Sequence, residues 1–200
     1  MMADLSGYTA LTEAHGASSA ADVIDKYIDI VKKCLVGESE LHERTGDAIM
    51  IVSATPDFLL STAIMILQTA SLENNFLQLH GGLHYGKILS RNNSYFGTAV
   101  NLTSRIAAQA SPGTFLCSGD FVNSLSDKTL IRLHSQGKHR FKNLNEEQEI
   151  FEIEMGHSKT YFIDPVCRML ILDVEKAISH PRLPNIFFCS EGCLEKYNKN

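Results

Sequence analysis

Residues 41–53 read Leu41-His42-Glu43-Arg44-Thr45-Gly46-Asp47-Ala48-Ile49-Met50-Ile51-Val52-Ser53 and predict a β-hairpin. Two expected strands flank the turn at 45–47. The second strand, 48–52, is apolar throughout, which predicts that it is buried on both faces. Asp47 then lies at the end of a strand, where its carboxylate can reach a point that it shares with another element.

On either side of this hairpin, the chain alternates between helical and extended patterns as far as residue 154. A helix is expected to begin near Ser19, with Ser19 as N-cap and Asp22 three residues later. The patterns predict helices over 19–35, 56–70 and 98–110, and further strands over 77–85, 114–118, 131–134 and 149–154. This order predicts an α+β fold of the ferredoxin-like sandwich type, with the helices on one face.

A second acidic motif, Ala3-Asp4-Leu5-Ser6-Gly7-Tyr8-Thr9, stands near the start of the sequence. Only three residues precede Asp4, so the strand that carries it is expected to be short, and its positioning correspondingly weak. Two carboxylates that are separated in sequence can hold two divalent metals on a nucleoside triphosphate. Either aspartate alone could as well cap a turn, and the pair in these contexts favours the metal site.

A third motif is Tyr95-Phe96-Gly97-Thr98-Ala99-Val100-Asn101-Leu102-Thr103-Ser104-Arg105. Asn101 and Arg105 are four positions apart on the expected helix and therefore project from one face. On spacing alone they could be ordinary surface residues. As a pair beside a bound triphosphate, they could stabilise a pentavalent phosphorus.

Together and in this order, the three motifs resemble the catalytic domain of class III adenylate/guanylate cyclases. The resemblance covers residues 1–154 and implies that ATP or GTP is converted to a 3′,5′-cyclic monophosphate and pyrophosphate in signal transduction. It also implies a homodimer with shared active sites. Two Mg²⁺ or Mn²⁺ ions per site would be held by Asp4, by the backbone carbonyl of Leu5 and by Asp47, while Asn101 orients the ribose and Arg105 contacts the α-phosphate.

The same resemblance suggests how the nucleotide is recognised. Glu43 and Ser94 occupy the positions that read the base, and a carboxylate at position 43 favours guanine because it accepts hydrogen bonds from the N–H edge of that base. Ser94 matches neither the adenylate nor the guanylate cyclases. Lys142, in the segment 137–144, matches the lysine that binds the terminal phosphates, although Asn143 follows it where the family usually has Gly. An exposed hairpin lysine is the alternative.

The C-terminal region differs in character. The motifs around Cys167, Cys189 and Cys193 follow a C-x21-C-x3-C spacing and resemble a YHS domain, close to the TRASH pattern proposed for heavy-metal sensing. Three thiolates suit Zn²⁺ or Cu⁺. Asp164 and His180 are the candidates for a fourth ligand, and a small buried cluster without metal is the alternative. The region 156–159 is a plausible linker, which makes 161–197 a small module of its own.

The composition and the charge indicate the class of partner, the location and the state of the cysteines. The 200 residues carry a formal net charge of −5, which argues against a nucleic-acid surface. No secretory signal and no membrane segment are recognisable, so a cytoplasmic location is expected. The odd number of cysteines, 5, favours reduced thiols or metal ligands over disulfides. Cys34 and Cys117 fall on apolar faces and are expected in the core.

Two other functions remain open at this point. The chain could be a degenerate cyclase-homology module that binds nucleotide, or only dimerises, in order to regulate a partner. It could also be a heavy-metal sensor in which the C-terminal module controls the cyclase-like part. The short first strand favours the non-catalytic reading, whereas the intact set of Asp4, Asp47, Asn101 and Arg105 opposes it.

Overall fold

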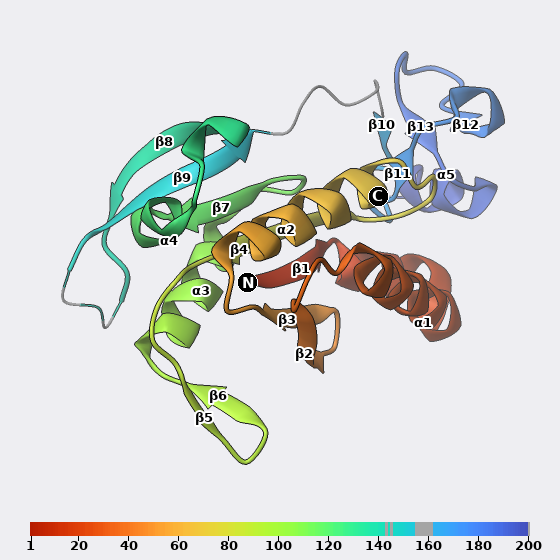
Figure 1. The fold of residues 1–200 in the computed structure, drawn as a ribbon. Coiled ribbons are helices and arrows are strands. Elements are labelled where there is room, and N and C mark those ends of the chain that lie inside the picture. The colour runs from red at the N-terminus through yellow and green to blue at the C-terminus, as the bar shows by residue number, and fades with distance from the viewer. Residues whose placement is uncertain (143, 145, 155–161, 200) are drawn as a thin grey trace.

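The computed structural model describes residues 1–142, 144, 146–154 and 162–199 (Figure 1). Its centre is a seven-stranded sheet in the order β2-β3-β1-β4-β7-β9-β8. Neighbouring strands are antiparallel except for β4 and β7, which are parallel. The strands are β1 (Met2–Ser6), β2 (Glu40–Thr45), β3 (Ala48–Val52), β4 (Gln78–Leu83), β7 (Phe115–Ser118), β8 (Arg132–His139) and β9 (Gln148–Glu154).

Helices cover both faces of this sheet. Leu79 and Leu83 of β4 belong to the main core, together with residues of α1 (Tyr8–Cys34) and α2 (Pro56–Ser71). Gly82 points the other way, and a Cβ there would collide with the backbone of α3 (Thr98–Gln109). The α3 face has its own core of Leu102, Ile106, Ala110, Leu116, Phe141 and Ile150. The α+β fold is confirmed, but the expectation of helices on one face is wrong, because alternate strand residues are apolar on both sides.

The first helix begins earlier than its pattern predicted. Gly7, at φ 94°, turns the chain directly from β1 into α1, and a second glycine, Gly16, interrupts the helix at φ 82° and ψ 169°. Both φ values are positive, in the region where residues with a Cβ are disfavoured. Ser19 lies inside the second half of α1, so its assignment as the N-cap is wrong. The buried Leu11 shows that the first half also packs on the core.

The strand that carries Asp4 lies in the middle of the sheet. β1 pairs with β4 over Met2–Ser6 and with β3 at Met2 and Ala3. The Met1 amino group donates to the Ile51 carbonyl at 2.8 Å, and burial lowers the pKa of this amino group to about 5. β1 is therefore held by β4 along its whole length and by β3 at its first residues.

The hairpin of β2 and β3 is confirmed, with one correction. Ile49 and Ile51 are buried, whereas Ala48 is exposed and Met50 is half-buried. The expectation that this strand is buried on both faces is therefore wrong. Because β2 and β3 form one edge of the sheet, their second face borders a cavity instead of a packed layer.

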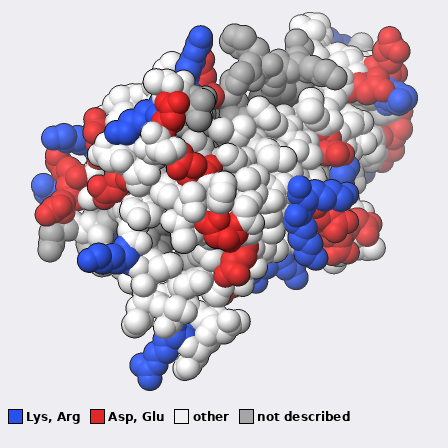
Figure 2. Space-filling model, viewed as in Figure 1, with Lys and Arg blue, Asp and Glu red and all other residues white. Residues whose placement is uncertain are grey.

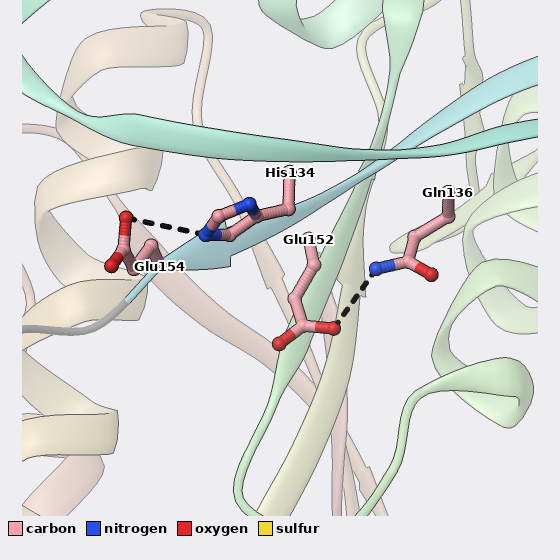
Figure 3. A network of polar contacts seen from close by, with 4 residues as sticks. All are labelled: His134, Gln136, Glu152 and Glu154. Carbon is pink, nitrogen blue, oxygen red and sulfur yellow. Dashed lines mark hydrogen bonds and ion pairs between the residues drawn. The ribbon is translucent and has the colours of Figure 1, made fainter.

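Several smaller elements complete this part of the fold. A hairpin of β5 (Leu89–Arg91) and β6 (Ser94–Phe96) projects from the body of the molecule (Figure 1), and it was not predicted. α4 (Gly119–Ser124) and a 3-10 turn, η1 (Lys128–Leu130), precede the β8–β9 edge. Polar pairs join these two edge strands: His134 Nε2 lies 3.3 Å from Glu154 Oε2, and Gln136 donates to Glu152 at 3.1 Å (Figure 3).

The C-terminal module, residues 162–199, is built from short pieces. Two small hairpins, β10 (Phe162–Ile163) with β11 (Leu170–Ile171) and β12 (Ile178–Ser179) with β13 (Phe187–Phe188), are followed by α5 (Glu191–Tyr197). A 3-10 turn, η2 (Val174–Lys176), joins the two hairpins. The expected linker at 156–159 lies outside the described residues.

This module is packed against the cyclase-like part of the chain. Leu170 exchanges backbone hydrogen bonds with the segment before β4, donating to Phe76 at 2.6 Å and accepting from Asn75 at 2.8 Å. Cys167, Phe188 and other module residues belong to the same apolar core as α1 and α2. Among the described residues, no helix is both long enough and apolar enough to cross a membrane.

Candidate active site

Asp4 and Asp47 come together where the turn of the β2–β3 hairpin meets strand β1. Asp4 lies in β1, and Asp47 lies in the turn between β2 and β3. Burial, followed by the negative charge of Asp4 and a hydrogen bond with it, raises the pKa of Asp47 to about 6. The Leu5 N–H donates to Asp4 Oδ1 at 3.0 Å and fixes that carboxylate. Two half-buried carboxylates that share a proton form an arrangement that a divalent cation stabilises.

Asp4 lines a cavity of about 330 Å³ between the sheet and α3, and the neighbours of Asp47 in the hairpin, Thr45 and Ala48, line it too. β1 and β3 contribute one side of it, and Val100, Ser104, Ala107 and Ala108 of α3 contribute the other. Glu43 and Tyr95 also line this cavity. It therefore joins the paired carboxylates to the residue at the expected base-reading position.

His80 is a member of this site that the sequence did not reveal. It lines the cavity, lies directly opposite Asp4 in the β1–β4 pairing, and hydrogen-bonds Ser6 Oγ through Nδ1 at 2.9 Å. Burial lowers its pKa, and the charge of Asp47 offsets part of this. Histidine spacing along the chain carried no signal, because the strand register, not sequence distance, brings His80 to the aspartates.

Asn101 and Arg105 lie on a different part of α3. Asn101 is exposed and Arg105 is half-buried, and neither is among the described residues that line the cavity. The cavity-lining residues Val100 and Ser104 each precede one of them, so the pair lies about 100° further round the helix. Asn101 and Arg105 therefore project to the side of the cavity-lining face of α3.

The two other expected nucleotide-binding residues lie apart from the carboxylates. Ser94 begins β6 and is half-buried, and its neighbour Tyr95 contacts His42 in a tilted arrangement with ring centroids 4.4 Å apart. Lys142 is exposed in the turn after β8, and the preceding Phe141 is buried in the α3 core. The adjoining Asn143 lies outside the described residues. The roles of Ser94 and Lys142 stay predictions.

The fold and this cavity can now be compared with known proteins. Residues 1–165 match the family described as the adenylate and guanylate cyclase catalytic domain. The chain belongs to this family. The match confirms the resemblance drawn from the three motifs, and it ends before the cysteines of the C-terminal module.

Relatives agree with this assignment. An uncharacterized protein of Mycobacterium tuberculosis is 34% identical over 126 residues, covering 62% of this chain and 33% of that protein. A pH-sensitive adenylate cyclase of the same species is 26% identical over 161 residues, covering 79% of this chain and 41% of the relative. The chain thus spans about a third to two fifths of the length of these relatives.

Solved structures show the same fold. An adenylate cyclase of Trypanosoma brucei in its monomeric state superposes with a TM-score of 0.71 at 17% identity, covering 86% of this chain and 91% of that one. At this identity the likeness concerns the fold alone. It confirms the α+β architecture around the paired aspartates.

The C-terminal cysteines of this cyclase homologue form a compact cluster. Cys167, Cys189 and Cys193 lie together with His15 of α1, and their ligand atoms are all within 4.8 Å of one another. The pKa of Cys189 is lowered to about 7 because Cys167 donates a hydrogen bond to it, and burial raises the pKa of Cys193 to about 12. All five cysteines are free thiols, and Cys34 and Cys117 are buried as expected.

The two residues expected as a fourth ligand have other roles. Asp164 is fully buried, and its carboxylate accepts hydrogen bonds from the backbone N–H groups of Val166, Cys167 and Cys189. Burial alone would raise its pKa, but these donors outweigh it and leave the pKa lowered. His180 accepts from two backbone N–H groups through Nδ1 and contacts Asn198 through Nε2. The expectation that either one completes the cysteine cluster is therefore wrong.

Proposed function

We propose that this chain converts a nucleoside triphosphate to its 3′,5′-cyclic monophosphate and pyrophosphate. The observation that carries the proposal is the pairing of Asp47 with Asp4, which lines a cavity, in a chain of the adenylate and guanylate cyclase family. The position of β1 opposes the alternative of a degenerate module, since β4 pairs with Asp4 itself and β3 pairs with the two residues before it.

The residues present fit a divalent metal centre. Asp4 and Asp47 would hold Mg²⁺ or Mn²⁺, because the charge of Asp4 raises the pKa of the adjacent Asp47 and a cation would relieve that repulsion. The Leu5 carbonyl, which lies in β1, is the third proposed ligand. When bound, the two metals neutralise the triphosphate and lower the pKa of the ribose 3′-OH.

The side chains of the protein then position and stabilise the reacting groups. A bond forms between O3′ and the α-phosphorus while the bond from that phosphorus to pyrophosphate breaks, and the 3′-OH proton passes to solvent. Asn101 would orient the ribose, and Arg105 would stabilise the charge on the α-phosphate. Lys142 would contact the terminal phosphates.

We propose that this chemistry uses two chains, because neither Asn101 nor Arg105 lines the cavity that contains Asp4 in the described part of the chain. The β5–β6 hairpin and its flanks expose Tyr85, Ile88, Leu89 and Phe96, with Leu89 at 62% and Phe96 at 52%. Exposed apolar side chains on a projecting arm favour burial against a second copy. We propose a homodimer in which Asn101 and Arg105 of one chain complete the site of the other.

The base remains a choice between adenine and guanine. Glu43 lines the cavity beside the aspartates and favours GTP through the N–H edge of guanine. Relatives named as adenylate cyclases, among them the pH-sensitive enzyme of M. tuberculosis, favour ATP. On the face shown in Figure 2, acidic and basic side chains are interspersed among uncharged ones. We place nucleotide recognition in the cavity, because Asp4 and Glu43 both line it.

The proposal is tested with purified protein, ATP or GTP, and Mg²⁺ or Mn²⁺, with cyclic product identified by mass spectrometry. One of the nucleotides is expected to give cyclic product and pyrophosphate in equal amounts. Asp29→Ala, an exposed aspartate on α1, serves as a control that keeps activity. Nucleotide binding without product from either nucleotide under either metal would refute the enzyme and favour the binding module.

A further inference from the structure

Four ligands from two distant parts of the chain converge beside helix α1. His15 ends the first half of α1, 174 positions before Cys189 and 178 before Cys193. We propose that His15, Cys167, Cys189 and Cys193 bind Zn²⁺ in a closed tetrahedral site that fastens the C-terminal module to α1. The histidine comes from the cyclase domain, so the site joins the two parts of the molecule.

The distances suit one tetrahedral ion. Cys189 Sγ lies 3.4 Å from Cys167 Sγ and 3.8 Å from Cys193 Sγ. His15 Nε2 lies 3.5 Å from the Cys189 sulfur and 3.4 Å from the Cys193 sulfur. Around a Zn²⁺ with ordinary bond lengths, the sulfurs would be about 3.8 Å apart and the nitrogen about 3.5 Å from each sulfur. These four separations come within a few tenths of an ångström of these values, and the Cys167 sulfur lies within 4.8 Å of the ligand atoms of both His15 and Cys193.

The surroundings hold the ligands in place. The buried carboxylate of Asp164 accepts hydrogen bonds from the Cys167 and Cys189 backbones, and so ties together the two loops that carry these sulfurs. Ser190 caps α5 by accepting from the Cys193 N–H at 3.3 Å. Such outer contacts are typical of metal sites. Four protein ligands leave no open position, which is typical of a structural and not a catalytic zinc.

The C-terminal module also contacts residues 7–15, the segment that follows the strand carrying Asp4. A Cβ at Gly7 would lie 2.5 Å from the Arg168 Cβ, so the residue after Cys167 packs directly on the turn between β1 and α1. Lys196 of α5 donates to the carbonyls of Glu13 and Ala14, at 3.0 and 2.6 Å. Residues 7–15 are thus held by Arg168 at one end and by Lys196 and the cysteines at the other.

A regulatory consequence follows, and this part rests on the proposed function. Residues 7–15 continue directly from the strand that carries Asp4. Loss of zinc would free the His15 end of this segment and loosen the positioning of that carboxylate. Misplacement of a catalytic group is costly, on the order of 100-fold in rate for about 1 Å. Zinc occupancy would then set how much of the cyclase is competent.

The site is tested first without any activity measurement. Reduced, metal-free protein is titrated with Zn²⁺, and then with Co²⁺ to read the visible bands of a tetrahedral thiolate site. We expect one ion per chain, affinity lowered at least about 10-fold in His15→Ala, and recovery in His15→Cys, which restores a fourth soft ligand. His134→Ala is the matched control, because it removes an exposed histidine outside the cluster.

Contrary outcomes are distinct. Equal Zn²⁺ affinity and an unchanged Co²⁺ spectrum in His15→Ala would show that α1 is not part of the site. Preferential binding of Cu⁺ that is indifferent to His15 would indicate a three-thiolate copper site and overturn the proposal. Hydrogen exchange measures the coupling between zinc binding and residues 7–15. Zinc removal should speed amide exchange in these residues, and equal exchange with and without zinc would refute the coupling. These measurements succeed or fail independently of cyclase activity.

Discussion

The two ligand clusters of this chain differ in chemistry and in accessibility. Asp4 and Asp47 are half-buried oxygen ligands at the edge of an open cavity, whereas the cysteine cluster is mostly buried and closed by His15. Hard carboxylates suit Mg²⁺ or Mn²⁺, which arrive with a nucleotide and leave with pyrophosphate. Thiolates and an imidazole suit a resident Zn²⁺. One short segment, residues 4–15, would therefore link the proposed exchangeable metal site to the proposed resident one.

Proton sharing is common to both clusters but has a different origin in each. At the aspartates, burial and a neighbouring charge raise the pKa of Asp47 to about 6. At the cysteines, a hydrogen bond from Cys167 lowers the pKa of Cys189 to about 7. In both places a cation would replace the shared proton, so metal affinity should fall as the pH is lowered.

The largest expected effect separates the two clusters by mutation. Asp47→Ala should lower kcat at least about 1,000-fold, because the loss of a metal ligand removes charge stabilisation in the transition state. Its zinc content should stay equal to that of the parent, since the cysteine cluster does not use Asp47. Kinetics and elemental analysis of the same preparation check both statements. Cyclase activity near the parent level would refute the role of Asp47.

Zinc removal should mainly affect stability. A ligand that binds only the folded state at roughly 1,000 times its Kd contributes about 4 kcal/mol. For a chain of this length, we therefore expect a chelator to lower Tm by about 10 °C. Cys189→Ser combined with Cys193→Ser should have a low Tm that the chelator no longer changes. A parent Tm that is insensitive to the chelator would contradict a structural zinc.

At the nucleotide site, the role of Glu43 in base selection can be tested by substitution. Glu43→Lys should shift the kcat/KM ratio from GTP towards ATP by roughly 5- to 150-fold, the value of one matched polar contact of about 1–3 kcal/mol. Arg44→Glu, which changes the neighbouring exposed residue, is the control. An unchanged ratio would show that Glu43 does not face the base.

The smallest expected effect concerns the fold without metal. Because the folded-state pKa of Asp47 is raised, its ionisation destabilises the fold fully above about pH 6 and not at all below about pH 4. Asp47→Asn should therefore be more stable than the metal-free parent at pH 7 by about 1 kcal/mol, after allowance for solvent screening of a half-exposed group. Thermal melts should show the two proteins converging as the pH falls to 4. A less stable variant at pH 7 would contradict the repulsion.

Local sequence patterns predicted the turns and helices whose formation depends on neighbouring residues. The turn at Asp47, the proline that opens α2 and the helix that carries Asn101 and Arg105 all lie where their patterns placed them. The paired aspartates followed from short motifs in a fixed order. These predictions succeeded because turn chemistry and helical spacing act over a few residues.

Contacts between residues that are far apart in the sequence could not be predicted from local patterns. His15 meets cysteines more than 170 positions away, and His80 reaches the aspartates only through the register of β1 and β4. The early start of α1 depended on Gly7 turning the chain immediately after β1. Assigning α3 to the opposite face required knowing that Gly82 leaves room for its backbone. Each of these follows from tertiary packing.

The composite site between two chains is the central claim, and mixing two inactive variants tests it most directly. Asp47→Ala and Arg105→Ala homodimers should each be nearly inactive, because every site lacks one essential group. After subunit exchange, a mixed dimer has one site with both defects and one with neither. Random pairing should restore about a quarter of the parent activity per chain. Complete exchange, confirmed by mass spectrometry, without regained activity in a preparation whose parent is active would contradict the shared site.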